Sequence, residues 1–174
     1  MKGVYKQGIF TITNRSKYIG SKDPVYKSGL EERVMNYMDK NTSVVKWSYE
    51  DERMSIEYYL PTDGRIHRYY PDFYMEAIGS SGTIKKFLIE VKTLKEVPED
   101  YLREMYGSKL EQKEFKRNLL KEPKSKLSKS KENYNRKRLT ILQNKAKFDA
   151  AKDFCKKNGM TFKIITQNEI SKLF

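Results

Sequence analysis

Two short segments contain acidic and basic residues whose spacing could support hydrolytic chemistry: PDF at residues 71–73 and IEVK at residues 89–92. Each lies in a stretch predicted to be a β-strand, and one hairpin turn separates the two stretches. Side chains alternate between the faces of a strand, so Glu90 and Lys92 should point the same way while the residues between them face an apolar layer. If the strands are adjacent, Asp72 completes a cluster with Glu90 and Lys92.

Two carboxylates at one point repel each other and are costly to desolvate, so their natural partner is a hard divalent cation. We expect Mg²⁺, with Mn²⁺ as a substitute, held by Asp72 and Glu90. Such an ion can polarise a phosphate and lower the pKa of water, while the Lys92 ammonium orients that water or offsets developing negative charge. This combination is typical of phosphodiester hydrolysis.

Each of these residues also has an alternative explanation without catalysis. Asp72 follows a proline and could end a hairpin, and Glu90 and Lys92 could form an exposed pair on a strand. His67 is the sole histidine; it could act as a general base, but the metal mechanism does not require it, so we expect it to support the site or contact DNA. The PDF segment, the single hairpin that follows it, the apolar strand ending in E-x-K, the preceding acidic helix and the basic composition all agree, and together they favour a nuclease.

The composition indicates one basic domain that binds nucleic acid. The 174 residues include 36 Lys and Arg against 23 Asp and Glu, a formal charge of +13, which favours DNA, RNA or anionic surfaces as partners. No apolar run approaches the roughly 20 residues of a spanning helix, and no secretory signal is recognisable, so we expect no membrane partner and a cytosolic protein. The single cysteine, Cys155, excludes an intrachain disulfide.

Hydrophobic spacing and turn residues predict an α/β (α+β) fold, with a mixed central sheet flanked by helices. We expect a single domain, 1–174, with an irregular N-terminal arm at 1–27 and a basic, partly helical and mobile insertion at about 96–138. The elements expected along the chain are a helix at 28–40, an antiparallel meander, a helix at 139–158 and a strand at 160–165. The meander consists of two β-prone runs within 43–60 and further runs at 65–77 and 83–91.

Several basic residues near these elements are candidates for DNA contact. Arg65 and Arg68 flank His67 in the RIHRYY segment, and Lys145 lies on the expected helix 139–158. The lysines at 109–138 could bind phosphates without reading sequence or could form a solvated tether. Tyrosines around the predicted site could stack on unpaired bases or pack the core.

The PDF and IEVK segments resemble the PD…(D/E)xK signature of the restriction-endonuclease-like superfamily. In that superfamily a glutamate on the first helix often joins the metal site, which implies that Glu31, or less favourably Glu32, would be a third ligand. Glu31 has an alternative role, because Ser28 and Glu31 also match a capping box at the start of a helix. We therefore expect Asp72, Glu90, Lys92 and Glu31 to form the catalytic set.

A closer resemblance covers residues 17–92 and 143–170, which are similar to tailed-phage head-completion nucleases. It implies an enzyme that acts on packaged DNA ends during virion assembly, in the host cytoplasm or the virion, with portal, neck or head proteins as partners. Separately, a cut through both strands would favour two copies of the protein acting together as a homodimer. The same pattern resembles the endonuclease subunit of a cut-and-paste transposon. The alternatives are thus a transposon-type or repair endonuclease, or a structural DNA-binding head protein with a nuclease fold.

Overall fold

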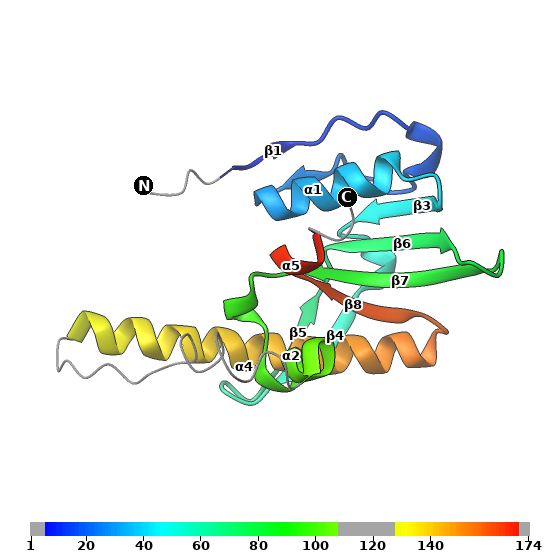
Figure 1. Ribbon diagram of the computed structural model, residues 1–174. Helices are drawn as coiled ribbons and strands as arrows, with labels where there is room; N and C mark the ends of the chain where they lie inside the picture. Colours follow the sequence, from blue (N-terminus) through cyan, green and yellow to red (C-terminus); the bar gives the residue numbers. More distant parts are fainter. Residues whose placement is uncertain (1–5, 108–127, 171–174) are drawn as a thin grey trace.

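The computed structural model describes residues 6–107 and 128–170, with a four-stranded sheet at its centre (Figure 1). The strands lie in the order β3 (Val44–Tyr49), β6 (Phe73–Ile78), β7 (Ile84–Val91) and β8 (Thr161–Ile165). The pairs β3–β6 and β6–β7 are antiparallel, whereas β7 and β8 are parallel. The expected mixed sheet flanked by helices is therefore confirmed.

Helix α1 (Gly29–Lys40) covers one face of this sheet, and its bounds agree with the predicted helix. Its apolar side, with Met35 and Met38 fully buried, packs against Trp47 and against Ile89 of β7. The short helix α5 (Gln167–Ile170) ends in the same core cluster through Ile170. The residues of β7 that flank Glu90 are thereby fixed on the α1 side.

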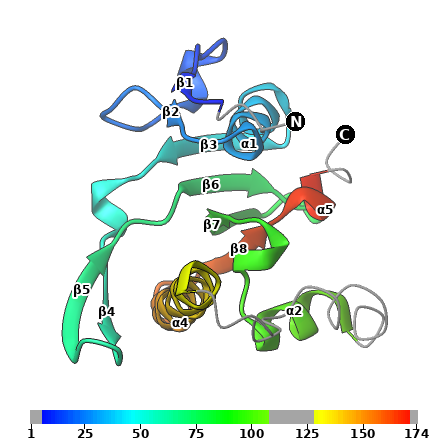
Figure 2. The same ribbon diagram turned by 90° about the vertical axis from the view of Figure 1, so that its left-hand side faces the viewer.

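Helix α4 (Ser128–Lys157) lies on the opposite side of the sheet, with the hairpin of β4 (Ile56–Leu60) and β5 (Arg65–Tyr69) beside it (Figure 2). The hairpin is a separate two-stranded sheet. Alternate residues of β4 are buried in a second core cluster, together with Leu88 of β7 and Ala151 of α4. The hairpin and α4 thus form a second layer over the face that carries Leu88.

The predicted antiparallel meander is wrong in its connectivity. The expected strand at 65–77 is divided by Pro71 into β5 and β6, which belong to different sheets, because proline cannot donate to a strand ladder. The neighbour of β3 is β6 rather than β4. The chain leaves the central sheet through the 3-10 turn η2 (Glu52–Met54), makes the hairpin, and returns at Asp72.

The structure describes only the two ends of the basic insertion expected at about 96–138, and both ends contain helix. After η3 (Leu94–Glu96), helix α2 (Glu99–Tyr106) packs Tyr101 and Leu102 against Phe148 of α4. Helix α4 begins eleven residues before the predicted 139, so residues 128–138 belong to it. Residues 108–127, which include most of the lysine-rich stretch, lie outside the described part.

The N-terminal arm is anchored to the core and is not only a surface segment. It contains β1 (Gly8–Ile9), the 3-10 turn η1 (Arg15–Lys17) and β2 (Val25–Tyr26). The rings of Phe10 and Tyr18 pack edge-on against Trp47, with centroids 6.0 and 4.6 Å away. Among residues 6–107 and 128–170, no helix has the length and apolar character to cross a membrane.

Candidate active site

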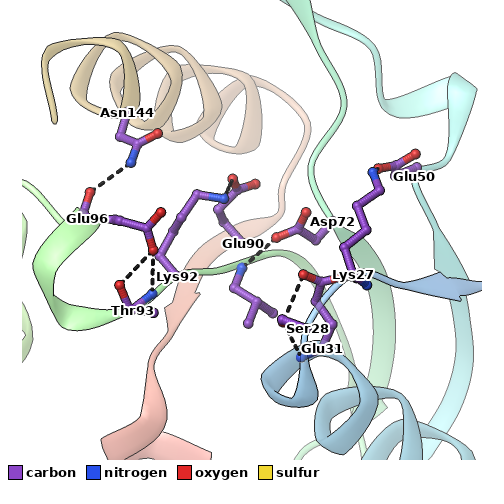
Figure 3. A network of polar contacts seen from close by, with 11 residues as sticks. Lys27, Ser28, Glu31, Glu50, Asp72, Glu90, Lys92, Thr93, Glu96 and Asn144 are labelled. Atoms are coloured by element: carbon purple, nitrogen blue, oxygen red, sulfur yellow. Dashed lines mark hydrogen bonds and ion pairs between the residues drawn. The ribbon is translucent and has the colours of Figure 1, made fainter. Parts of the chain in front are cut away.

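Asp72 and Glu90 are brought together by the pairing of β6 with β7. Phe73 pairs with Ile89 in antiparallel register, so Asp72, one residue before β6, lies across from Glu90. The Asp72 carboxylate accepts a hydrogen bond from the backbone N–H of Val91 at 2.7 Å. The structure therefore joins the PDF and IEVK segments at one end of the sheet, as the sequence predicted (Figure 3).

Glu90 and Lys92 project to the α4 side of the sheet, while Ile89 and Val91 are buried in the α1-side core. The Lys92 ammonium forms an ion pair with Oε1 of Glu90 at 2.8 Å. The second carboxylate oxygen, Oε2, is buried and has no hydrogen-bond partner among the described residues. The buried Tyr69 hydroxyl interacts with Glu90 but makes no hydrogen bond of normal geometry, so this oxygen of Glu90 is still able to bind a further cation or donor.

The electrostatics of the cluster reflect two carboxylates in a confined space. Desolvation, followed by repulsion from Glu90, raises the pKa of Asp72 well above its usual range, and Lys92 opposes this only in part. Burial would lower the pKa of Lys92, but Glu90 and Asp72 more than offset it, so this pKa is raised and the ammonium form is favoured. Burial and the same two carboxylates also raise the pKa of Tyr69.

Asp72 and Glu90 provide only part of the coordination shell of a divalent cation. Among the described residues, no three side chains of His, Cys, Asp or Glu come together as ligands for one metal ion. Asp72 and Glu90 supply hard oxygen donors, including the unpartnered Oε2 of Glu90. Mg²⁺ is commonly bound through one or two carboxylates with water and substrate phosphate completing its shell, so the pair fits this ion.

Glu31 lies on α1 on the other side of Asp72, but its carboxylate is used locally (Figure 3). Its Oε2 accepts from the backbone N–H of Lys27 at 2.7 Å, and its Oε1 accepts from the Ser28 hydroxyl at 2.9 Å. The Ser28 oxygen in turn accepts from the Glu31 N–H at 3.1 Å. Ser28 therefore caps α1, but the expected capping box is only half formed, because Glu31 accepts from the Lys27 N–H and not from the Ser28 amide. Glu31 is also close enough to contribute to the raised pKa of Asp72.

The predicted DNA-contact residues lie outside the Asp72–Glu90–Lys92 cluster, on β5 and α4. Arg65 and Arg68 are exposed on β5, and His67 is hydrogen-bonded to Asp63 at 2.8 Å and stacked on the Tyr58 ring. Lys145 is directed toward α2, where it pairs with Asp100 at 2.5 Å. It also pairs with Asp149 of its own helix at 3.2 Å. The geometry therefore does not bring Lys145 to the Asp72–Glu90 cluster.

Sequence reasoning missed Lys147, the lysine of α4 that faces the cluster. Its ammonium lies over the rings of Tyr69 and Tyr58, and its electrostatic environment includes both Glu90 and Asp72. A lysine in a helix rich in lysines carries no distinguishing signal. Only its spacing of four residues from the buried Ala151 could have placed it on the inner face of α4.

Comparisons with known proteins indicate which proteins this chain is similar to. The chain is 27% identical over 161 residues to the head completion nuclease of Enterobacteria phage T4, covering 92% of this chain and 90% of that protein. No solved structure matches. A family model described as "TnsA-like endonuclease N terminal" matches residues 41–167, which include β3 through β8 together with Asp72, Glu90 and Lys92. The chain therefore belongs to the TnsA-like endonuclease N-terminal family.

Proposed function

We propose that this protein is a DNA endonuclease that hydrolyses phosphodiester bonds with a divalent metal, Mg²⁺ in the first place, at Asp72 and Glu90. The observation that carries the proposal is the Asp72–Glu90–Lys92 cluster, in which one oxygen of Glu90 is buried without a partner. Membership of an endonuclease family supports the same chemistry. The formal charge of +13 suits a polyanionic substrate.

In this mechanism a water oxygen forms a bond to phosphorus, the bond from phosphorus to one deoxyribose oxygen breaks, and a proton from the water is transferred to the leaving oxygen or to solvent. When bound, the metal would supply Lewis-acid chemistry that withdraws charge from the phosphate and acidifies water. Asp72 and Glu90 would hold the metal, and the Val91 N–H fixes the orientation of the Asp72 carboxylate. Lys92, kept charged by Glu90, balances negative charge that develops at the phosphate.

Glu31 would be a third carboxylate for the metal. It would bind the metal through a water molecule, or directly once its hydrogen bonds to Lys27 and Ser28 have broken. Its carboxylate contacts Lys27 and Ser28, and both contacts lie near the molecular surface, where exchange with water is inexpensive. Around this centre, Arg65, His67 and Arg68 of the β5 strand would contact the DNA backbone.

We further propose that the protein completes phage heads by acting on packaged DNA ends, in the host cytoplasm or the virion. The support is the named relative of phage T4, which aligns with nearly the whole chain. Portal, neck or head proteins would then be its docking partners, and two copies would cut both strands. A transposon-type role is the second candidate, because the family model is named for a TnsA-like endonuclease.

The first test is cleavage of supercoiled plasmid with Mg²⁺, Mn²⁺ or chelator. Wild type should nick or cut only with metal, and Asp72→Asn and Lys92→Ala should lose cleavage on the order of 100-fold or more. The matched control is Asp153→Asn, which removes an exposed carboxylate of α4 and should cut normally. Absence of cutting by wild type on plasmid, linear and branched DNA would instead favour a structural DNA-binding protein.

A further inference from the structure

One row of residues on α4 faces the core cluster that the β4–β5 hairpin forms with Leu88 of β7. Residues four apart share a helix face, and Gln143, Lys147 and Ala151 form such a row. Gln143 donates a hydrogen bond to the Tyr58 hydroxyl at 3.1 Å, and Ala151 is fully buried in the core cluster with Leu88. Lys147, between them, is therefore directed inward although lysine ordinarily lies at the surface.

The Lys147 ammonium lies between two tyrosine rings on the side of the cluster that α4 covers. It is 5.5 Å from the ring centroid of Tyr69 and 5.9 Å from that of Tyr58. Tyr69 is buried, and its hydroxyl has no hydrogen bond of normal geometry among the described residues. The Lys147 ammonium also interacts electrostatically with Glu90, whose second carboxylate oxygen has no hydrogen-bond partner among the described residues.

Lys147 differs from the other described lysines of α4 that face protein. Lys145 and Lys152 are each held in ion pairs, with Asp100 and Glu104 respectively. No ion pair or hydrogen bond is present for Lys147 within residues 6–107 and 128–170. Burial lowers the pKa of Lys147, and Lys92 adds to this effect, whereas the negative charges of Glu90 and Asp72 oppose it. A recessed cation that has no acidic partner among the described residues is suited to bind an anion that enters from solvent.

We propose that Lys147 is a second phosphate-binding residue of the active centre, whose ammonium contacts a non-bridging oxygen of the DNA phosphate that lies beside the Asp72–Glu90–Lys92 cluster. This inference rests on the proposed nuclease function and adds to it a contact from the α4 side. Lys92 is committed to Glu90 through its ion pair, whereas Lys147 is free to follow the substrate. The two tyrosine rings stabilise the ammonium until the phosphate arrives.

A purely structural role for Lys147 makes the opposite prediction about stability. If the lysine only packs against Tyr58 and Tyr69, its replacement by methionine should affect folding and cleavage together. If it serves substrate, methionine removes a recessed charge at similar volume, and the melting temperature should stay the same or rise. A stable protein with impaired cleavage would therefore identify a functional lysine.

The experiment compares wild type, Lys147→Met and Lys147→Arg with Lys152→Met, which removes a lysine of the same helix on the α2 side. Three quantities are measured: the melting temperature, the single-turnover rate of plasmid cleavage at saturating protein, and binding of a short fluorescent DNA duplex in chelator as a function of salt. Binding in chelator needs no metal and no catalysis. It therefore reports on Lys147 independently of the nuclease proposal.

We expect Lys147→Met to cleave on the order of 100-fold more slowly without loss of melting temperature, and Lys147→Arg to recover part of the rate. The slope of log affinity against log salt should fall by about 0.9, the change for one phosphate contact, and Lys152→Met should leave rate and slope unchanged. Cleavage and slope equal to wild type, or a parallel loss of stability and rate, would overturn the inference. If wild type does not cut at all, the nuclease proposal fails, and the salt slope alone decides whether Lys147 binds phosphate.

Discussion

Asp72 is a residue whose environment disfavours its own charge. The carboxyl is recessed beside Glu90, and desolvation and this neighbour raise its pKa. For an acid whose pKa is higher in the folded state than in the unfolded state, stability is fully present below the unfolded pKa and is lost as pH rises through the folded pKa. Without metal, the ionised pair therefore destabilises the fold near neutral pH, and a bound divalent ion should reverse this.

The variant Asp72→Asn should accordingly be more stable than metal-free wild type, and the difference in melting temperature should grow from about pH 5 to about pH 8. Addition of Mg²⁺ should raise the melting temperature of wild type and leave that of the variant nearly unchanged, because a ligand stabilises only the state that binds it. The measurement is thermal unfolding in chelator and in Mg²⁺, with Asp153→Asn as control. A variant less stable than wild type at every pH would contradict the argument.

Glu31 has two roles to reconcile, a cap for α1 and a ligand near Asp72. Glu31→Gln keeps an oxygen that can accept from Lys27 or Ser28, so the loss of stability should be below about 1 kcal/mol. A neutral amide binds Mg²⁺ less well, so the Mg²⁺ concentration for half-maximal cleavage should increase about 10-fold or more. Glu32→Gln, which alters the neighbouring carboxylate paired with Lys6, is the control. An unchanged Mg²⁺ requirement in Glu31→Gln would assign the residue to capping alone.

At the scale of secondary structure, the turn after β3 supports the start of β6. Glu50 has a φ of 38°, in the left-handed region, and its N–H donates to the carbonyl of Asp72 at 3.0 Å. Glycine adopts this conformation readily, whereas a β-branched residue does not. Replacing Glu50 by either residue removes the same ion pair with Lys27, so a comparison of the two isolates the backbone.

We expect Glu50→Gly to be more stable than Glu50→Val by about 1–2 kcal/mol, the cost of a side chain in the left-handed region. Chemical denaturation measures this difference. Because a displaced turn also moves the Asp72 backbone, Glu50→Val should cleave DNA more slowly than Glu50→Gly. Equal stability of the two variants would show that the turn relaxes to another conformation.

The elements that the sequence predicted well are those whose signal is local. Helix α1 shows an apolar stripe and a cap at Ser28, and β7 alternates so that Glu90 and Lys92 share one face. Connectivity was harder, because Pro71 divides a run that has continuous β-propensity. Lys147 could not be singled out, since 55 residues separate it from Lys92 and only the packing of α4 brings the two together.

At the scale of the whole molecule, the N-terminal half of α4 extends beyond the core at the end of the sheet where the Asp72–Glu90–Lys92 cluster lies. A turn at Gly159 reverses the chain from α4 into β8, and β8 is parallel to β7, so the N-terminal half of α4 lies toward the C-terminal end of β7. Thirty residues of helix span about 45 Å, well beyond the five residues of β8 (Figure 1). Residues 136–138 are basic and exposed on this projecting half.

This projecting half should act as an electrostatic arm for DNA flanking the cut. Replacing Arg136 and Arg138 by glutamine should weaken DNA binding at moderate salt and reduce the salt slope by up to about 1.8, two phosphate contacts, while the single-turnover rate at saturating protein stays near wild type. Replacing Lys156 and Lys157 at the opposite end of α4 removes the same charge and should change neither quantity appreciably. Equal effects of the two pairs would mean that only net charge matters, whereas a loss of rate with unchanged affinity would place the arm in catalysis. The expected asymmetry would fix the direction in which DNA leaves the cluster, along α4 and away from Gly159.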